Sequence, residues 1–295
     1  MKERCAGHNL QRRRRNAASA FLLLALAAAL AVWLAWGNTA LTVNRITVRS
    51  ARIPAGFDGF RIAQVSDLHD AEFGENNEKL LALLAECEPD IIVMTGDLID
   101  ANRTDIDKSL DFAEGAAEIA PMYYVTGNHE GAIMEYWILR EGLTAAGINV
   151  LTDRACRLSR GGDTLLLAGL DDPNFATSEE IAEGFPAMIE KKLAHITEGY
   201  DGYTVLLAHR PEYIGSYAVG GADLVLSGHA HGGQIRLPFI GGLAAPGQGL
   251  FPKYDAGLYT VGGTDMIVSR GLGNSIFPLR INNRPEIVLI TLERE

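Results

Sequence analysis

Cysteine is scarce in this sequence of 295 residues, which contains only Cys5, Cys87 and Cys156. No two of them form a C-x-x-C pair, so neither a thiolate zinc site nor a disulfide framework is indicated. Cys87 and Cys156 could form one bridge outside the cytoplasm, but two isolated thiols are the simpler interpretation. The chemistry of the protein therefore has to come from other side chains.

Positive charge is scarce outside the N-terminus. The formal net charge is −11, but residues 1–45 carry +6 and the rest of the chain carries −17. A nucleic-acid-binding surface needs a basic stripe. The acidic body therefore argues against a nucleic acid as partner, although local basic pockets are compatible with it.

The body also lacks internal repeats, low-complexity segments and a second linker. The simplest division is a segment over 37–52, which is a linker or a first strand, followed by one folded domain over 53–295. A domain of about 250 residues is large enough to bury a sizeable core.

Charge is missing altogether from residues 17–36, directly after the block Arg12–Arg15. At about 1.5 Å per residue, 20 helical residues cross a bilayer core of roughly 30 Å. Trp33 and Trp36 are typical of a membrane interface, and the positive-inside rule keeps the arginines in the cytoplasm. We predict a cytoplasmic basic tail (1–16), a single transmembrane signal anchor (17–36) and a body outside the cytoplasm.

Two alternatives for this apolar run stay open. It is either a signal peptide that is cleaved after export, or a buried core helix. A signal h-region is usually only about 7–15 residues long, which favours the anchor. Adjacent arginines before an apolar run are compatible with twin-arginine export.

Five short apolar runs in the body each end in a polar cluster that contains Asp, Asn or His. The runs and clusters are 61–65 into SDLHD (66–70), 90–94 into TGDLID (95–100), 122–125 into TGNHE (126–130), 203–207 into AHRPE (208–212) and 224–226 into SGHAHGGQ (227–234). Runs of this kind are typical of strands buried on both faces. Helical patterns over 77–84, 109–120, 133–146 and 178–195 lie between strands, so the alternation predicts an α/β core. Further runs at 164–168, 266–269 and 286–292 indicate a mixed second sheet.

Five of the seven histidines lie in these clusters. Loops at the carboxyl ends of strands converge on one edge of an α/β sheet, where ligands bind. A single cluster has an ordinary structural explanation, such as a helix cap or a turn. Histidines with unrelated structural roles would not gather in this way, so we predict one shared site.

Oxygen and nitrogen side chains in the clusters form a candidate metal-ligand set. Its members are Asp67, His69, Asp97, Asn128, His209, His229 and His231. Without sulfur, this set fits Mn, Fe or Zn at a hydrolytic centre. Seven ligands exceed the need of one catalytic ion with open positions, so we infer two divalent metal ions about 3.5–4 Å apart, bridged by one carboxylate.

Taken in order, the clusters resemble the signature of the calcineurin-like metallophosphoesterases, D-x-H … G-D … G-N-H-[ED] … H … G-H-x-H. It is matched by 67–69, 96–97, 127–130, His209 and 228–231. Phrases at 208–212, 231–238, 269–273 and 284–288 look like the bacterial membrane-anchored or exported phosphodiesterases of this superfamily. The resemblance implies two mixed β-sheets packed as a sandwich and flanked by helices, to which the transmembrane helix is added.

The resemblance also implies roles for single residues. Asp67, His69, Asp97 and His231 would hold one ion, and Asp97, Asn128, His209 and His229 the other, with Asp97 as the bridge. His129 would be the general acid for the leaving oxygen or a donor to the developing charge. Asp100 resembles the carboxylate that orients this histidine, and a surface turn residue is its alternative role.

The reaction that the resemblance implies is in-line attack of a metal-bridging hydroxide on phosphorus. We therefore predict a phosphodiesterase that acts outside the cytoplasm on an envelope or lipid-linked substrate. One alternative is a pyrophosphatase of a nucleotide-linked lipid precursor, and another is a non-catalytic metal-binding scaffold, against which the complete ligand set argues. Many relatives have an apolar residue directly after the histidine of D-x-H. This chain has Asp70 at that position and Glu72 two residues later.

Two arginines and one loop are candidates for contacts with the substrate. Arg210 and Arg270 could pair with a phosphate or hold structural salt bridges. The segment 237–254 is rich in Gly, Pro and apolar residues. We expect it to form an irregular rim that grips an acyl or prenyl chain or packs as an ordinary loop.

Overall fold

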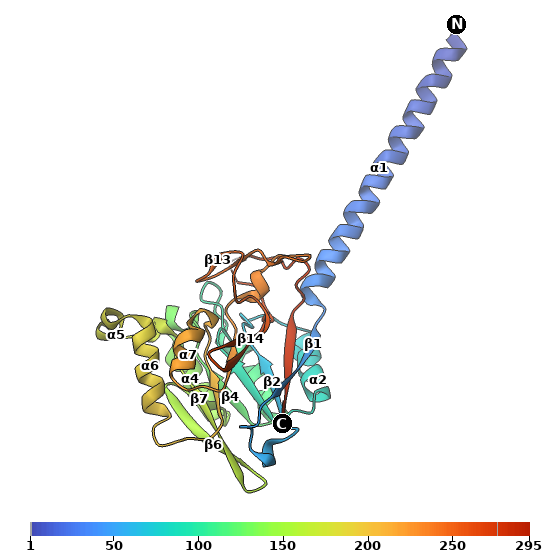
Figure 1. The fold of residues 1–295 in the computed structure, drawn as a ribbon. Coiled ribbons are helices and arrows are strands. Elements are labelled where there is room, and N and C mark those ends of the chain that lie inside the picture. Colours follow the sequence, from blue (N-terminus) through green and yellow to red (C-terminus); the bar gives the residue numbers. More distant parts are fainter. Residues whose placement is uncertain (1, 276) are drawn as a thin grey trace.

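The computed structural model describes residues 2–275 and 277–295, with side chains from Asn16 onward. The side chains of Arg12–Arg15, on which the predicted topology depends, lie outside the described residues. Helix α1 (Lys2–Thr39) is continuous and projects away from the body (Figure 1). Its apolar part, Asn16–Thr39, is long enough to cross a membrane and is 0% buried, so it is not a core helix.

Two six-stranded mixed sheets form the centre of the body. The first has the order β1-β16-β2-β3-β4-β5 and the second β14-β15-β9-β8-β7-β6. The strands of the first sheet are β1 (Thr42–Arg49), β2 (Arg61–Val65), β3 (Ile91–Thr95), β4 (Met122–Val125), β5 (Asn149–Val150) and β16 (Glu286–Glu293). Those of the second are β6 (Arg154–Arg160), β7 (Asp163–Gly169), β8 (Thr204–Leu207), β9 (Leu224–Ser227), β14 (Gly257–Val261) and β15 (Thr264–Val268). Strands β2 to β5 run parallel, as do β7, β8, β9 and β15.

Helices cover the outer face of each sheet. The α-helices of the body are α2 (Glu78–Glu86), α3 (Ile106–Ile119), α4 (Tyr136–Ala145), α5 (Ser178–Glu183), α6 (Phe185–Ile196) and α7 (Ile214–Val219). Helices α2, α3 and α4 pack on the first sheet, and α6 and α7 pack on the second. Short 3₁₀ turns are η1 (Ala55–Phe57), η2 (Glu75–Asn77), η3 (Glu130–Ala132), η4 (Pro173–Phe175), η5 (Pro211–Tyr213) and η6 (His231–Gly233).

The strand sequences explain this layering. In β3, Ile91 and Val93 belong to the core between the sheets, whereas Ile92 and Met94 belong to the core under the helices. Successive side chains of a strand point to opposite faces, so a strand covered on both sides must be apolar throughout. The predicted sandwich of two mixed sheets flanked by helices is confirmed.

The structure divides one expected helix, and it adds α7 and the strands β5, β6 and β14, which were not predicted from the sequence. The predicted helix over 178–195 is two helices, α5 and α6, which meet at Gly184 (φ 88°). This backbone conformation ends α5, and Pro186 follows in the first turn of α6, where a missing N–H is tolerated.

Two open alternatives from the sequence also have clear outcomes. Residues 42–49 are a strand and not a linker, because β1 pairs with β16 along its whole length. This strand lies at the edge of the first sheet. Cys87 and Cys156 are both free, so the bridge between them is not formed.

The expected rim over 237–254 contains two small two-stranded ladders. Strand β10 (Arg236–Leu237) pairs with β11 (Gly241–Gly242), and β12 (Ala244–Ala245) pairs with β13 (Gly249–Leu250). These ladders lie at the end of the body from which α1 leaves (Figure 1).

Candidate metal centre

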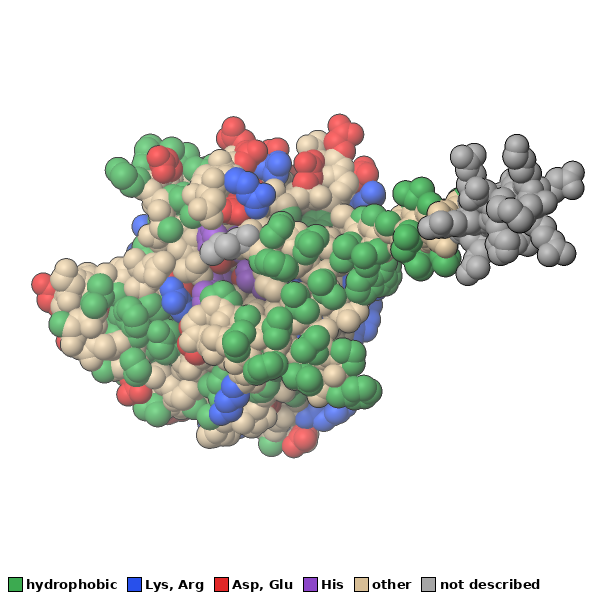
Figure 2. All heavy atoms as spheres, turned by 90° about the horizontal axis from the view of Figure 1, so that it is seen from above, with side chains coloured by type: hydrophobic (Ala, Val, Ile, Leu, Met, Phe, Trp, Pro, Cys, Tyr) green, Lys and Arg blue, Asp and Glu red, His purple; other side chains and the backbone are tan. Residues whose placement is uncertain are grey.

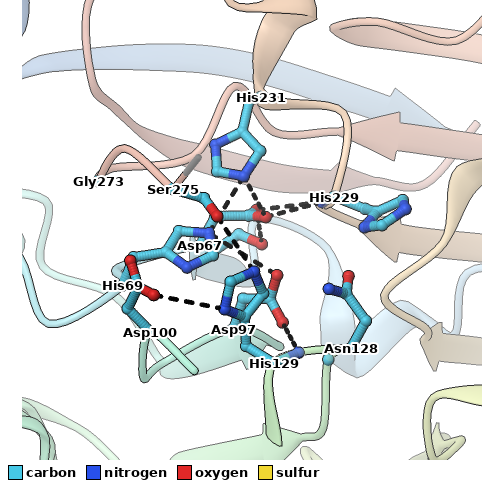
Figure 3. A network of polar contacts seen from close by, with 12 residues as sticks. Asp67, His69, Asp97, Asp100, Asn128, His129, His229, His231, Gly273 and Ser275 are labelled. Atoms are coloured by element: carbon cyan, nitrogen blue, oxygen red, sulfur yellow. Dashed lines mark hydrogen bonds and ion pairs between the residues drawn. The ribbon is translucent and has the colours of Figure 1, made fainter. Parts of the chain in front are cut away.

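The seven predicted ligands come together at the carboxyl ends of both sheets. They are carried by the loops after β2, β3 and β4 of the first sheet and after β8 and β9 of the second. Six of them are buried and Asn128 is half-buried. Figure 3 shows Asp67, His69, Asp97 and His231 close together, with Asn128 and the ring of His229 beside them.

One group of four could hold a metal ion: Asp67, His69, Asp97 and His231. His231 Nε2 lies 3.1 Å from His69 Nε2 and 3.4 Å from Asp67 Oδ1. His69 Nε2 lies 3.7 Å from Asp97 Oδ2. These donor atoms surround a single point between the loops.

A second group shares Asp97 with the first and adds His209 and His229. His209 Nε2 lies 3.2 Å from Asp97 Oδ2 and 3.2 Å from His229 Nδ1. Asn128 Oδ1 is 3.3 Å from the same nitrogen of His209. Asp97 thus stands between two clusters of donors, as a bridging carboxylate must.

The chemistry of these donors fits two divalent cations. Burial lowers the pKa of His69 to about 4 and the pKa of His231 well below its usual value, which leaves lone pairs free. His209 donates its Nδ1 hydrogen to the Thr95 carbonyl at 2.7 Å, so its Nε2 faces the site. Burial alone would lower the pKa of His209, but the charge of Asp97 raises it to about 10, so a cation must displace a proton there.

The backbone at the site is locally strained. Asp67, His69, Asp97, His229 and His231 have φ between 47° and 65°. This left-handed region is unfavourable for residues with a side chain and costs of order 1–3 kcal/mol each. The chain turns sharply directly after its strands here, and that turn points the ligands inward.

Glycines allow the ligand loops to touch. A Cβ atom at Gly127 would overlap Asp97, and one at Gly228 would overlap Ser66 and Asp67. Close backbone approach of this kind is possible only for glycine. Gly127 therefore brings together two loops of the first sheet, and Gly228 brings the histidine loop of the second sheet against Asp67 of the first.

Glu130, which follows His129 in its motif, joins two of the ligand loops. Its Oε2 accepts hydrogen bonds from the backbone N–H groups of Gly127 (2.7 Å) and Asp97 (3.0 Å). Its Oε1 accepts from Leu98 (2.7 Å) and Ile99 (3.3 Å). The only sequence signal for Glu130 is its position as the last residue of G-N-H-[ED]. That position does not indicate which backbone groups it binds.

His129 lies at the mouth of the centre, 11% exposed. Its backbone N–H donates to Asp97 Oδ1 at 2.8 Å. Its ring Nδ1 accepts from the Ala101 N–H at 2.9 Å, which places the proton of the neutral ring on Nε2. That nitrogen is 3.1 Å from Ser275 Oγ.

Asp100 is beside His129 but does not accept a hydrogen bond from it. Its Oδ1 is 3.8 Å from His129 Nδ1, which is too long for a hydrogen bond. It accepts instead from the Asn102 N–H and from Arg103, both at 2.8 Å. Asp100 therefore shapes the loop that carries Ala101, and this loop contacts the ring.

The two predicted substrate arginines are engaged in salt bridges. Arg210 donates from Nε and Nη2 to both oxygens of Asp172, at 2.7 and 2.8 Å. Arg270 donates to Glu286 from Nε at 2.8 Å and also from Nη2. Both carboxylates are buried, so the structure shows the salt-bridge alternative for each arginine.

Sequence reasoning missed Arg280, which is 1% exposed. Its Nη1 and Nη2 donate to the carbonyls of Arg270 (2.8 Å) and Gly273 (2.6 Å). Nη2 lies 3.5 Å from His231 Nδ1. Burial lowers its pKa to about 10. Arg280 lies outside the five polar clusters, so no motif marked it.

A cavity of about 400 Å³ opens beside the centre, with His69, Asp70, Arg103 and Ser275 in its wall. Asp70, where the sequence departs from many relatives, accepts from the Asp100 N–H at 2.8 Å and from Ser109 Oγ at 2.8 Å. It ties together the loops after β2 and β3. The cavity is large enough for part of a substrate next to the ligands.

Comparisons with known proteins agree with this geometry. Residues 60–233 match the sequence profile described as calcineurin-like phosphoesterase. An uncharacterized metallophosphoesterase of Bacillus subtilis, YkuE, is 33% identical over 251 residues, which are 84% of each chain. The phosphodiesterase YaeI of Escherichia coli is 30% identical over 79% of this chain and 82% of its own.

The fold is also found in a solved structure. The protein TT1561 of Thermus thermophilus superposes with a TM-score of 0.50 and 16% sequence identity. The match covers 72% of this chain and 90% of that one. The arrangement of the two sheets is therefore common to both proteins.

Proposed function

This chain belongs to the calcineurin-like phosphoesterase family, and we propose that it hydrolyses phosphodiesters at a membrane, outside the cytoplasm, with two divalent metal ions. It is a metallophosphoesterase, a hydrolase of phosphoester bonds. What we propose beyond this family membership is that the protein binds two metal ions, that its substrate is a diester and that it acts outside the cytoplasm.

One observation carries the proposal: two ligand groups share the carboxylate of Asp97. A single metal ion would need only one of the groups. Two ions held about 3.5–4 Å apart can clamp both the attacking and the leaving oxygen of an in-line displacement. When bound, they would supply Lewis-acid activation of water and of the phosphoryl group.

The protein's own residues supply a hydrogen-bond donor and its orientation. His129 presents Nε2–H toward the open side of the centre, because the Ala101 N–H occupies Nδ1. That N–H can donate a hydrogen bond to the leaving oxygen and stabilise the negative charge that develops there as the ester bond breaks. The ring is fixed by the backbone bond to Asp97 and by the loop that Asp100 and Arg103 shape.

Three observations support the diester and the location. The relative YaeI is named a phosphodiesterase. The cavity beside His69 gives room for a second ester group. Helix α1 is exposed and long enough to span a bilayer, and Arg12–Arg15 before it favour a cytoplasmic N-terminus. An envelope or lipid-linked substrate fits these features.

The test is turnover by the full chain in detergent, loaded with Mn²⁺. We expect hydrolysis of bis(p-nitrophenyl) phosphate with a higher kcat/KM than that of p-nitrophenyl phosphate. Asp97→Asn is the matched control, since it keeps the shape of the side chain and removes the bridging charge; it should lose both metal and activity. Protein that contains two metal ions and cleaves neither ester would overturn the proposal.

A further inference from the structure

Charge is distributed unevenly over the second half of the body. Segments 224–254 and 266–285 contain no acidic residue, although the chain after residue 45 carries −17. Of their five basic residues, Arg236 pairs with Asp255, Arg270 pairs with Glu286 and Arg280 is buried, which leaves Lys253 and Arg284 as the cations without a carboxylate partner in the described residues. An acidic body is repelled by an anionic bilayer, whereas a face with free cations and no free carboxylate is attracted to one.

The same segments carry large exposed apolar side chains. They are Leu237, Phe239, Ile240, Leu250, Phe251, Phe277 and Leu279, seven of the thirteen such side chains outside α1 in the described residues. Figure 2 shows hydrophobic side chains gathered beside the histidines on the face from which α1 leaves. Single exposed apolar residues are ordinary, but a contiguous patch marks an interaction surface. We call these seven residues the apolar face.

Helix α1 is joined to this region without a flexible linker. Asn38 Oδ1 accepts from the Arg280 N–H (2.7 Å) and from Asn274 Nδ2 (3.1 Å). Arg284 donates to the carbonyls of Ala40 (2.8 Å) and Leu41 (2.6 Å). Strand β1 begins at Thr42, so α1, residues 40–41 and the first sheet follow one another directly. We call the contacts of residues 38–41 with Asn274, Arg280 and Arg284 the joint.

The joint also fixes where a bilayer surface would lie. About 20 helical residues cross the hydrocarbon core, which places Trp36 at its outer boundary when the span begins at Ala17. The Arg284 guanidinium lies over the Trp36 ring, 4.6 Å from its centroid. A body residue therefore touches the helix at the level of the headgroups. Phe277 and Leu279 precede Arg280, whose backbone is bonded to Asn38.

We propose that the apolar face docks on the membrane that holds α1, so that the metal centre takes phosphoesters whose apolar part stays in that bilayer. The statement about substrate rests on the proposed function. The occupant is the bilayer because the span, the interfacial tryptophans and the free cations Lys253 and Arg284 all meet this face. The seven side chains would lie at the hydrocarbon boundary, and Arg284 and Lys253 would lie among the headgroups.

The metal centre opens beside this face. The cavity next to His69 is also lined by Asn274, Ser275 and Pro278. This is the loop that carries Phe277 and Leu279 and that contacts His129 through Ser275. A phosphoester at the bilayer surface would therefore need to move only past this loop to reach the ligands.

Depth in the bilayer tests the docking directly. The full chain, with its three cysteines changed to alanine, is reconstituted in phosphatidylcholine–phosphatidylglycerol vesicles and labelled with NBD at Phe239→Cys. The matched control is Ser159→Cys, an exposed residue in β6, at the far end of the body from α1 (Figure 1). We expect nitroxide lipids to quench NBD at 239 at least fivefold more than at 159. Equal quenching at the two positions would overturn the docking.

Turnover tests the statement about substrate. The variant Phe239→Glu/Phe251→Glu is compared with Ile181→Glu/Val219→Glu, whose exposed apolar residues lie outside the face. Only the first should lose tenfold or more of the hydrolysis of a coumarin ester of phosphatidic acid in vesicles. Both should keep hydrolysis of bis(p-nitrophenyl) phosphate within twofold.

The two proposals fail in different ways. If the wild-type chain cleaves the soluble diester but not the vesicle-borne ester, the substrate statement is wrong and the proposed function stands. If it cleaves neither, the proposed function fails, and the quenching experiment still decides whether the face docks. Equal losses on both esters in the Phe239→Glu/Phe251→Glu variant would also contradict the inference.

Discussion

At the scale of single residues, the ligands were predictable and their partners were not. Asp67 and His229 stand in motifs whose residue types already indicate metal. The Nδ1 of His129 is instead set by the backbone N–H of Ala101, which any residue except proline could supply at that position. Arg280 has backbone partners as well, and its contact with His231 depends on packing between distant segments. Such contacts leave no pattern in residue types.

His129→Ala should separate metal binding from stabilisation of the leaving oxygen. We expect two metal ions per chain, as in the wild type, and a loss in kcat of about 10²–10³-fold for an alkyl ester, because one preorganised donor to a developing oxyanion contributes roughly that much. For p-nitrophenyl esters the loss should be smaller, since nitrophenolate spreads its charge over the ring and needs less stabilisation. Metal analysis and kcat for both leaving groups check this. Equal losses for the two would show that His129 does not act on the leaving oxygen.

At the scale of elements, local patterns identified most strands and most helices, but not β5, β6, β14 or α7. Val- and Ile-rich runs followed by polar clusters are recognisable as strands, because burial on both faces requires a continuous apolar sequence. The division of one predicted helix at Gly184 is a local effect that the helical periodicity masked. The pairing of β16 with β1 and β2 joins segments about 220–245 residues apart in the sequence, and periodicity contains no information on such contacts.

The loops after β3 and β4 should depend on the charge of Glu130. Glu130→Gln keeps the size of the side chain but turns one acceptor oxygen into a donor that faces backbone N–H groups. We expect a loss of about 1–3 kcal/mol in the free energy of unfolding, together with weaker metal binding. Denaturant titration and metal titration check this, with Glu88→Gln at an exposed position as control. Unchanged values in both would show that Glu130 does not organise the loops.

At the scale of the whole molecule, the metal centre joins the two sheets, because its ligands come from both. Binding that is restricted to the folded state stabilises it by about 2.7 kcal/mol per ion at a hundredfold excess over Kd. Chelation should therefore lower Tm by about 2–4 °C for each kcal/mol lost in a chain of this size. Thermal scans with Mn²⁺ and with EDTA check this. Asp97→Asn, which cannot bridge two ions, should be far less sensitive to the chelator.

The joint at Asn38 has a consequence for kinetics. With α1 in a bilayer, a body without a flexible linker can turn about the membrane normal and diffuse in the plane, but it cannot reach into the solution. The rate at which it meets a lipid substrate then depends on the density of that substrate in the membrane. Inert lipid added to the same vesicles would dilute the substrate and slow turnover, although the bulk concentrations of enzyme and substrate stay the same.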